Sequence, residues 1–560
     1  MNLEYIYKNV YFMNSYIDFE SKKIPVYYTA RTVKFKMFST FDKHFNKDIF
    51  EIVDDGSKIS LNIHYDRNIK LDGYDLEITK KAINIKANSE RAASYAINVL
   101  NNLVSFKQNK ARLPLIHIYD EPSFRYRGII EGYYGEPWSF ESRKDLANFM
   151  SKHRLNTYMY APKSDPYHRV KWNELYPEAE LKNLVDFKNS LENNYIDFYY
   201  CLSPGYTKGG GKIFEYVKEE DFELLFKKFD QVVEQGITKF GLLLDDIDYK
   251  LSGANLEKFK RPGIAHAHIC NVIYNYLSNK VIDLEVVMCP TEYHQIGESE
   301  YRNDLRTLLN ENIKVFWTGD NVCAEVITDY QAEVTKDAFG HNLFIWDNFP
   351  VTDFTYGVRQ YMGPIVNRTA DLNKYASGYI INPMNLYEIS KIAMITQAHF
   401  AWNSYKYDSK TSFEIALKEI GEDFYKQGLA YVNYNLPSVL THGYRDYELE
   451  LLDNKEELIK YLDNVKKSAT NLLKLDLPII KELKPWLDRV IQERDIVEKI
   501  VNDKLKKVEL LKFLENDKFS GSEILDNLIK KHNLLTDEEY ANLIKKRRGN
   551  PWYRIWEDKK

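Results

Sequence analysis

The chain has 560 residues and a formal net charge of −5, from 82 acidic and 77 basic side chains. At roughly 150 residues per domain, this length predicts about three or four domains. A charge so close to zero argues against broad nucleic-acid binding. Hydrophobic residues make up 44% and charged residues 28% of the chain, which excludes large-scale disorder and is typical of a globular protein.

The cysteines and the hydropathy give no sign of a secreted or membrane protein. Four cysteines lie far apart without a C-x-x-C spacing, so we expect neither a disulfide framework nor a structural zinc site. The first residues lack the basic start and apolar core of a signal peptide, and no apolar run approaches the ~18 residues that span a bilayer. We expect a cytoplasmic protein with no membrane contact; a secreted protein trimmed of its leader would have the same sequence.

Residues 1–122 mix strand-like and helix-like patterns. Alternating apolar residues predict two short strands, formed around Leu76 and Ile78 and around Ile83 and Ile85. The helix predicted after them has one apolar stripe, formed by Ala93, Ile97, Leu100 and Val104. This region is interpreted as a small α+β domain.

Residues 123–405 alternate short apolar runs with amphipathic stretches of helical length. Eight such runs occur: RGIIEG, NTYMYA, IDFYYCL, KFGLLL, LEVVMCP, IKVFWT, NLFIWD and GYIINP. Runs that are apolar throughout belong to strands buried on both faces, as in parallel sheets with crossover helices. Eight of them in this length predict a (β/α)8 barrel.

Residues 406–560 lose the strand pattern. From KEELIKYL onward the periodicity is helical, with one stripe formed by Leu462, Val465, Ala469, Leu472 and Leu473 and another by Val490, Ile491, Val497 and Val501. We expect a helical domain packed on the barrel.

Polar residues follow seven of the eight runs. They are Glu131 with Gly132, Lys163, Asp245 with Asp246, Glu292 with Tyr293, Thr318 with Asn321, Asp347 with Asn348 and Asp353, and Asn382. In a barrel the carboxyl ends of all strands open on one face, where active sites lie. This convergence predicts a single site.

Asp245 and Asp246 are the strongest candidates for catalysis. Two carboxylates held close together cannot both ionise easily, so one pKa should be raised and that group could act as a general acid. Neighbouring strand residues point to opposite faces, so both acids reach the site only if the strand has already ended. The alternative is that the pair caps the amino end of a helix, where Asp is favoured.

Nucleotide and metal chemistry have little support. No G-x-G-x-x-G motif follows a strand, and the P-loop pattern is absent. His266 and His268 form an H-x-H pair, but no third ligand has a suitable spacing. We expect neither a metal nor an organic cofactor.

Seven motifs, in order along the barrel, resemble those of glycoside hydrolase family eighty-four, the β-N-acetylglucosaminidases that include O-GlcNAcases and enzymes described as hyaluronidases. The motifs are RGIIEGYYGEPWS, NTYMYAPKSDPYHRVKWNELYP, LLLDDI, CPTEYH, WTGDNV, IWDNFPVTDF and INPMN. The preceding YDLEIT…INIKANSERAASYAINVL segment resembles the small α+β domain of bacterial members.

The resemblance implies removal of terminal β-linked N-acetylglucosamine with retention of configuration. In this family the 2-acetamido oxygen of the sugar attacks C1 and forms an oxazoline, an exception to the usual pair of enzyme carboxylates. Asp245 matches the residue that orients the acetamide, and Asp246 matches the general acid and base. The implied substrates are O-GlcNAc on Ser or Thr of proteins, or GlcNAc glycosides.

Further matches assign the substrate-binding residues. Gly132 and Lys163 match contacts near O3 of the sugar, whereas Asp353 and Asn382 match groups near O4 and O6. Asn348 matches a contact to the acetamido group and the reacting centre. The walls of the acetamido pocket match Cys289, Tyr293, Thr318 and Trp346, and Val322 matches a wall near the aglycone.

One departure and several alternatives stay open. Several members have W-T-G-P after the sixth strand, where this chain has Trp317-Thr318-Gly319-Asp320, a change that could loosen the loop or alter aglycone preference. The alternatives are a non-catalytic GlcNAc-binding protein, a hyaluronan-directed glycosidase, and a hexosaminidase mechanism that would use an Asp-Glu pair. The oligomeric state is not predicted.

Overall fold

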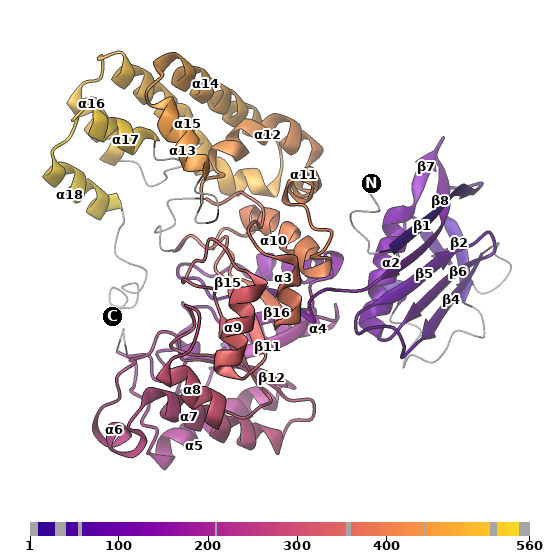
Figure 1. The fold of residues 1–560 in the computed structure, drawn as a ribbon. Coiled ribbons are helices and arrows are strands. Elements are labelled where there is room, and N and C mark those ends of the chain that lie inside the picture. Colours follow the sequence, from indigo (N-terminus) through magenta and orange to yellow (C-terminus); the bar gives the residue numbers. More distant parts are fainter. Residues whose placement is uncertain are drawn as a thin grey trace.

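The structure of the protein, a computed structural model, describes residues 9–28, 41–53, 59–207, 210–353, 360–438, 440, 443–515 and 524–547. Figure 1 shows three parts in chain order: an amino-terminal sheet with one long helix, a strand barrel ringed by helices, and a group of carboxy-terminal helices. These parts agree with the fold class predicted from the sequence.

The amino-terminal part is an eight-stranded mixed sheet. Its path runs β1-β8-β5-β6-β4-β2-β3, with β7 paired to β8. The strands are β1 (Asn9–Asp18), β2 (Ile24–Tyr28), β3 (Phe50–Ile52), β4 (Ile59–Tyr65), β5 (Tyr74–Ile78), β6 (Ala82–Ala87), β7 (Ser105–Lys107) and β8 (Lys110–Asp120), with a short 3-10 helix η2 (Asp42–His44). The two strands predicted from alternating residues are β5 and β6, which pair antiparallel.

Helix α2 (Glu90–Leu103) covers one face of this sheet (Figure 1). It begins after Ser89, whose side chain accepts a hydrogen bond from the backbone N–H of Ala92, a common way to satisfy the first turn of a helix. Three residues of its predicted stripe, Ala93, Ile97 and Leu100, are buried. The fourth, Val104, lies one residue beyond the helix in an extended conformation.

The barrel consists of eight parallel strands in the order β10-β11-β12-β13-β14-β15-β16-β9. They are β9 (Tyr126–Glu131), β10 (Thr157–Tyr160), β11 (Asp197–Leu202), β12 (Lys239–Leu243), β13 (Glu285–Cys289), β14 (Ile313–Trp317), β15 (Leu343–Asp347) and β16 (Ala376–Ile381). Each corresponds to one of the eight apolar runs, so the (β/α)8 prediction is confirmed.

Helices between the strands surround the barrel (Figure 1). They are α3 (Phe140–Lys152), α4 (Glu178–Glu192), α5 (Glu219–Val233), α6 (Gly253–Phe259), α7 (Pro262–Ser278), α8 (Glu300–Leu308), α9 (Asp329–Phe339) and α10 (Tyr387–Trp402), with the 3-10 helices η3 (Pro166–His168) and η5 (Ala370–Lys374).

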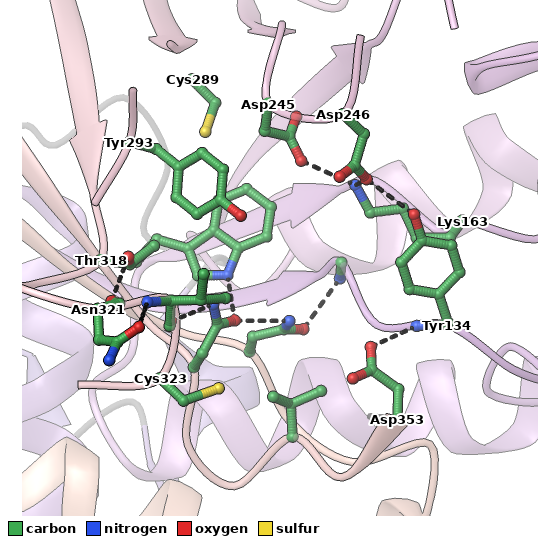
Figure 2. A pocket seen from close by; sticks show the side chains of 16 residues that line it. Tyr134, Lys163, Asp245, Asp246, Cys289, Tyr293, Thr318, Asn321, Cys323 and Asp353 are labelled. Atoms are coloured by element: carbon green, nitrogen blue, oxygen red, sulfur yellow. Dashed lines mark hydrogen bonds and ion pairs between the residues drawn. The ribbon is translucent and has the colours of Figure 1, made fainter. Parts of the chain in front are cut away.

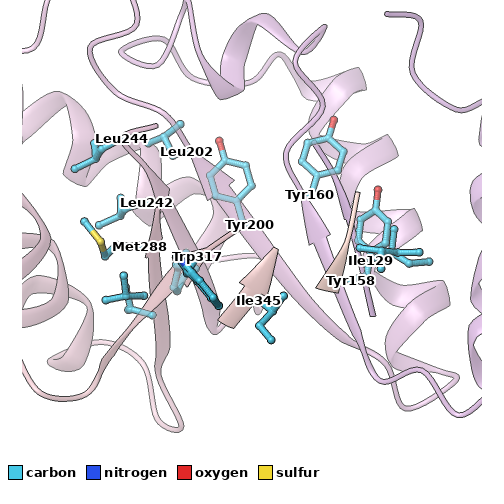
Figure 3. Close-up of a cluster of buried hydrophobic side chains, with 14 of the residues drawn as sticks. Ile129, Tyr158, Tyr160, Tyr200, Leu202, Leu242, Leu244, Met288, Trp317 and Ile345 are labelled. Carbon is cyan, nitrogen blue, oxygen red and sulfur yellow. The ribbon is translucent and has the colours of Figure 1, made fainter. Parts of the chain in front are cut away.

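Alternate strand residues pack into two separate cores. Ile129, Tyr158 and Tyr200 join helix residues in one cluster, part of which Figure 3 shows. Their neighbours Ile130 and Met159 pack with other strand residues in the barrel interior. Because both faces of each strand are buried, the runs are apolar throughout rather than alternating.

A buried ion-pair network joins the amino-terminal part to the barrel. Arg127 at the start of β9 donates to Asp72 at 3.1 Å, and Arg154 donates to Asp120 at 3.1 Å. Trp402 at the end of α10 also donates to Asp120, at 2.8 Å. All five side chains are buried, so the two parts share a polar, water-excluded junction.

The carboxy-terminal part is helical: α11 (Ser409–Ile420), α12 (Glu422–Tyr434), α13 (Gly443–Leu451), α14 (Lys455–Leu472), α15 (Pro478–Val501), α16 (Lys507–Glu515), α17 (Ile524–Lys531) and α18 (Asp537–Arg547). Helices therefore start well before the KEELIKYL segment. The buried face of α11 is formed by Ser412, Ala416 and Leu417, and so small and weakly apolar a stripe gives little periodic signal.

In α14 the predicted stripe residues Leu462, Val465, Ala469 and Leu472 are buried. Leu473 caps the carboxyl end of the helix. Val490 and Val497 of α15 are buried, and Ile491 is partly exposed. Within the ranges that the structure describes, no helix has both the length and the apolar character needed to cross a bilayer.

Glu482 on α15 connects this helical part to α10 and makes stability depend on pH. It accepts a hydrogen bond from the N–H of Ile389 at 2.8 Å. Burial raises the pKa of Glu482 to about 7, despite the opposing hydrogen bonds from the amino end of α10. Between pH 4.5 and 7 the folded protein thus holds a proton that the unfolded chain releases, so stability falls as pH rises through this window.

We expect Glu482→Gln to flatten that dependence, because an amide does not titrate. The wild-type protein should lose about 2 kcal/mol of stability between pH 5 and 7.5 relative to the variant, measured by urea denaturation at each pH. Glu456→Gln on the exposed side of α14 is the matched control. Parallel pH curves for the wild type and the Glu482 variant would contradict this assignment.

Candidate active site

A cavity of about 670 Å³ lies at the carboxyl ends of the barrel strands (Figure 2). All twelve site residues predicted from the sequence line it, and they come from seven of the eight strand ends. The lining consists of Gly132, Tyr134, Lys163, Asp245, Asp246, Cys289, Tyr293, Thr318, Asn321, Val322, Cys323, Trp346, Asn348, Val351, Asp353 and Asn382.

Asp245 and Asp246 reach the cavity together because β12 ends at Leu243, two residues earlier. Both acids lie in a bend, where the alternation of a strand no longer applies. The next helix, α6, starts at Gly253 after Ser252. The alternative that this pair caps a helix is therefore wrong.

Lys163 connects the two acids. Its ammonium group lies 3.2 Å from Oδ2 of Asp245 and 3.4 Å from Oδ2 of Asp246, and its side chain is 4% exposed. Asp246 receives two further hydrogen bonds, from Nη2 of Arg169 and from the hydroxyl of Tyr134, each at 2.8 Å. Two positive charges from the segment after β10, and one hydroxyl from the segment after β9, thus lie against the pair.

This environment works against a raised pKa at Asp246, the acid that the family resemblance matches to the general acid and base. Burial by itself would raise the pKa of Asp246, but Lys163, Arg169 and the hydroxyl of Tyr134 outweigh it and hold the pKa well below the usual value. In the free site Asp246 is a carboxylate. It is ready to accept a proton, and it must gain one before it can donate one.

Asp245 has a buried acceptor oxygen, Oδ1, without a hydrogen bond from the described residues. Asp245 also interacts electrostatically with Cys289 and Tyr293 on the β13 side of the cavity, and Figure 2 shows these three side chains close together. A buried acceptor without a donor is costly, so this oxygen is suited to an N–H group of a ligand.

The β13, β14 and β15 ends form an apolar wall. Trp346 is 5% exposed and packs edge-on against Phe316, with ring centroids 5.2 Å apart. Thr318 donates its backbone N–H to the carbonyl of Tyr293 at 2.9 Å. Burial raises the pKa of the Cys289 thiol well above its ordinary value, so Cys289 serves as a small apolar filler rather than a nucleophile.

A chain of hydrogen bonds forms a polar rim next to this wall, at the ends of β15, β16 and β9. Gly132 donates its N–H to Oδ1 of Asn382 at 3.3 Å, and Nδ2 of Asn382 donates to Oδ1 of Asn348 at 3.0 Å. The indole N–H of Trp346 donates to the same Asn348 oxygen at 2.9 Å. Asp353 accepts the backbone N–H of Tyr134 at 2.9 Å. These bonds orient the polar side chains before any ligand enters.

Gly132 must be a glycine for steric reasons. A Cβ atom there would lie 2.7 Å from Cζ2 of Trp346. Because the N–H of Gly132 is already bonded to Asn382, a contact from Gly132 to a ligand would come from its carbonyl oxygen.

The loop after β14 is held in place without the proline that several relatives have. Thr318 donates its hydroxyl to the carbonyl of Asn321 at 2.8 Å, and Asn348 donates to the carbonyl of Val322 at 2.8 Å. Arg368 donates to the carbonyls of Ala324 and Glu325. Asp320 itself is exposed, and Val322 is 38% exposed at the cavity mouth.

The sequence did not identify every residue of the site. Tyr134, Cys323 and Val351 also line the cavity, as does Asn321, which was predicted at a strand end but given no role. Tyr134 belongs to the EGYYG motif directly after β9, so its place at a strand end could have identified it as a site residue. Arg169, nine residues after β10 ends, gave no comparable signal because nothing in the sequence places it against Asp246.

Three of the polar residues predicted at strand ends lie outside the cavity. Glu292, after β13, accepts hydrogen bonds from the hydroxyls of Tyr249 at 2.9 Å and Ser299 at 2.5 Å. Glu131 pairs with Arg143 at 2.7 Å, and Asp347 pairs with Arg368 at 2.8 Å, both in buried surroundings on the helix side of the barrel.

His266 lies on α7, where Nδ1 contacts the hydroxyl of Tyr301. In the described part of the chain, no group of three or more His, Cys, Asp or Glu side chains could hold a metal ion.

Comparisons with known proteins agree with this geometry. A family model described as beta-N-acetylglucosaminidase matches residues 127–432. The Protein O-GlcNAcases of Rattus norvegicus and Mus musculus are each 31% identical over 313 residues, which is 53% of this chain and 33% of theirs. The chain thus spans about a third of the length of these relatives.

Two solved structures have a similar fold. CpGH84B aligns over 99% of both chains with a TM-score of 0.74 and 23% identity. A variant of the Thermobaculum terrenum O-GlcNAc hydrolase aligns with a TM-score of 0.67 and 26% identity, over 76% of this chain and 97% of that one. The match to the family model covers more than half of the chain, and the chain belongs to the β-N-acetylglucosaminidases of glycoside hydrolase family eighty-four.

Proposed function

We propose that this protein is a retaining exo-β-N-acetylglucosaminidase that works by substrate assistance. The observation that carries the proposal is the pair Asp245 and Asp246, bridged by Lys163 within a cavity that has an apolar wall and a polar rim. The relatives named for O-GlcNAc hydrolysis support the same reaction class.

Asp245 is the residue that we assign to the acetamide. Its buried Oδ1 accepts no hydrogen bond from the described residues, and Tyr293 and Trp346 in the same cavity offer apolar surface for a methyl group. A carboxylate on the amide N–H makes the amide oxygen a better nucleophile. Holding that oxygen close to C1 makes the attack intramolecular, which can contribute several kcal/mol.

Asp246 is the residue that we assign to proton transfer. In the first step it donates a proton to the glycosidic oxygen while the bond from C1 to that oxygen breaks and the amide oxygen bonds to C1. In the second step the Asp246 carboxylate takes a proton from water while the water oxygen attacks C1 and the oxazoline opens. Two displacements at C1 restore the β configuration.

The polar rim is assigned to the sugar hydroxyls. We assign Lys163 and the carbonyl of Gly132 to contacts near O3, and Asp353 and Asn382 to contacts near O4 and O6. We assign Asn348, which bonds to Trp346 and Asn382, to the acetamido group and the reacting centre. A rim that binds the far edge of the sugar favours a terminal residue.

For the substrate we propose terminal β-GlcNAc on Ser or Thr of proteins, or on small glycosides. Asp248 and Asp320, on the loops after β12 and β14, are both exposed. Acidic side chains there disfavour a polyanion such as hyaluronan, which is the second candidate substrate.

The test compares rates on an aryl β-GlcNAc, an O-GlcNAc protein and hyaluronan fragments, with product configuration followed by NMR. We expect turnover of the first two, β-configured product at the start, and inhibition by a thiazoline that mimics the oxazoline. Initial α product, or indifference to the thiazoline, would contradict substrate assistance. Binding of GlcNAc without any turnover would favour the non-catalytic alternative.

A further inference from the structure

Arg169 lies directly against Asp246 but outside the cavity lining. Its side chain is 2% exposed. Nη2 donates to Oδ2 of Asp246 at 2.8 Å, and Nη1 donates to the hydroxyl of Tyr134 at 3.1 Å. Since Tyr134 itself donates to Oδ2 of Asp246 at 2.8 Å, the three groups form a closed triangle of hydrogen bonds.

The guanidinium group is fixed from other directions as well. Its central carbon lies 3.7 Å from the ring centroid of Tyr206, on the segment after β11. Arg169 follows η3 directly, and Asp165 caps η3 by accepting the N–H of Tyr167 at 2.8 Å. The local fold therefore sets the orientation of Arg169 independently of its bond to Asp246.

All donors to Asp246 converge on one of its two oxygens. Arg169, Tyr134 and Lys163 each reach Oδ2, at 2.8, 2.8 and 3.4 Å. Within the described part of the chain, no hydrogen bond reaches Oδ1, and the side chain is 29% exposed. Oδ2 is thus held by the protein, and Oδ1 is left without a protein donor in the described part of the chain.

We propose that Arg169 is a positioning residue that orients Asp246, so that Oδ1 is the atom which exchanges protons with the glycosidic oxygen and then with water. This inference rests on the proposed function. Oδ2 keeps its three donors throughout. The proton leaves Oδ1 as the glycosidic bond breaks, and Oδ1 receives a proton from water as the oxazoline opens.

Besides orienting Asp246, Arg169 acts on it through its positive charge. This electrostatic effect can be measured separately from the packing of the Arg169 side chain. The groups that face Asp246 are Tyr134 from the β9 side, Lys163 and Arg169 from the β10 side, its neighbour Asp245, and Cys289 and Tyr293 from the β13 side. Lys163 contacts both acids, whereas Arg169 hydrogen-bonds only Asp246 of the pair. A change at Arg169 therefore reports mainly on Asp246.

The experiment compares Arg169→Met, which removes the charge at similar length, with Arg169→Lys, which keeps the charge but not the planar fork. The rates are kcat/KM values on a dinitrophenyl β-GlcNAc and on a serine-linked GlcNAc peptide, measured from pH 2.5 to 9 so that the range extends toward the lowered pKa of Asp246. Because Arg169 stabilises the carboxylate form, its removal should move the alkaline limb of the profile to higher pH, by about one unit or more.

The two substrates should respond differently. A dinitrophenolate leaves without much help from an acid, so we expect Arg169→Met to slow that substrate by only about threefold, and the serine-linked peptide by about tenfold or more. Arg169→Lys should keep the alkaline limb near its wild-type position. Lys171→Ala, an exposed change on the same segment, is the control and should match the wild type.

If Arg169→Met lowered kcat/KM by the same factor on both substrates and left the alkaline limb of the pH profile in place, the proposal would be overturned. Such a result would show only that packing was damaged. A second measurement does not depend on turnover: the carboxyl NMR titration of ¹³C-labelled aspartate, with Asp246→Asn identifying the resonance. A higher midpoint for Asp246 in Arg169→Met supports the proposal, and an unchanged midpoint overturns it. A wild-type protein that titrates as expected but hydrolyses neither substrate would refute the proposed function instead.

Discussion

Replacing Asp246 with Asn is expected to reduce kcat/KM on a serine-linked GlcNAc peptide by about 10²- to 10⁴-fold, because Asn can neither donate nor accept the transferred proton. A dinitrophenyl glycoside should lose much less in its first step, since its leaving group needs no proton. Steady-state rates on both substrates, with a thiazoline binding constant measured by calorimetry, test this expectation. Inhibitor binding should be largely kept, because the cavity walls are unchanged.

Asp248→Asn is the matched control for this change. Asp248 lies two residues further along the same loop, is exposed, and accepts a hydrogen bond from Thr207 at 3.2 Å outside the cavity. Its rates should equal those of the wild type. Near-normal turnover of the peptide by the Asp246 variant would show that the proton comes from another group.

The second large effect concerns stability rather than chemistry. Asp120 ends β8 and accepts hydrogen bonds from Tyr74 at 3.0 Å, Arg154 at 3.1 Å and Trp402 at 2.8 Å. Asp120→Ala would leave the buried Arg154 without this partner at the junction of the sheet and the barrel. We expect a loss of about 3–5 kcal/mol in the free energy of unfolding, measured by urea denaturation.

An ion pair on the outside of the same sheet provides the comparison. Asp18 pairs with Arg112 at 2.6 Å, but the Asp18 side chain is 67% exposed. Asp18→Ala should cost less than about 1 kcal/mol, because water already solvates both charges. If the two alanine variants were equally stable, the buried junction would not be what holds the amino-terminal sheet to the barrel.

The barrel was readable from the sequence because its strands are buried on both faces. In runs such as KFGLLL and NLFIWD the polar residues stand only at the ends, and each run forms a strand. The helical part was harder to delimit. In α11 the buried face is Ser412, Ala416 and Leu417, which is too weakly apolar to stand out before the packing partners are known.

The membership of the site was also largely predictable. Residues at the ends of parallel strands are brought together by topology alone, and the twelve side chains chosen on that basis and from the family resemblance all line one cavity. Glu131 and Asp347 show the limit of the argument. They also stand at strand ends, but they face Arg143 and Arg368 on the helix side, and the direction of a terminal strand residue depends on where the strand stops.

The sequence by itself determined the family, the barrel and the two neighbouring acids, since all three depend on residue type and order along the chain. Only the tertiary structure decided the charge state of Asp246. Its three donors come from Tyr134 after β9 and from Lys163 and Arg169 after β10, far from it in sequence. The sequence predicted a raised pKa for one acid of the pair, but at Asp246 the positive charges that folding brings against the carboxylate outweigh the cost of burial and lower its pKa.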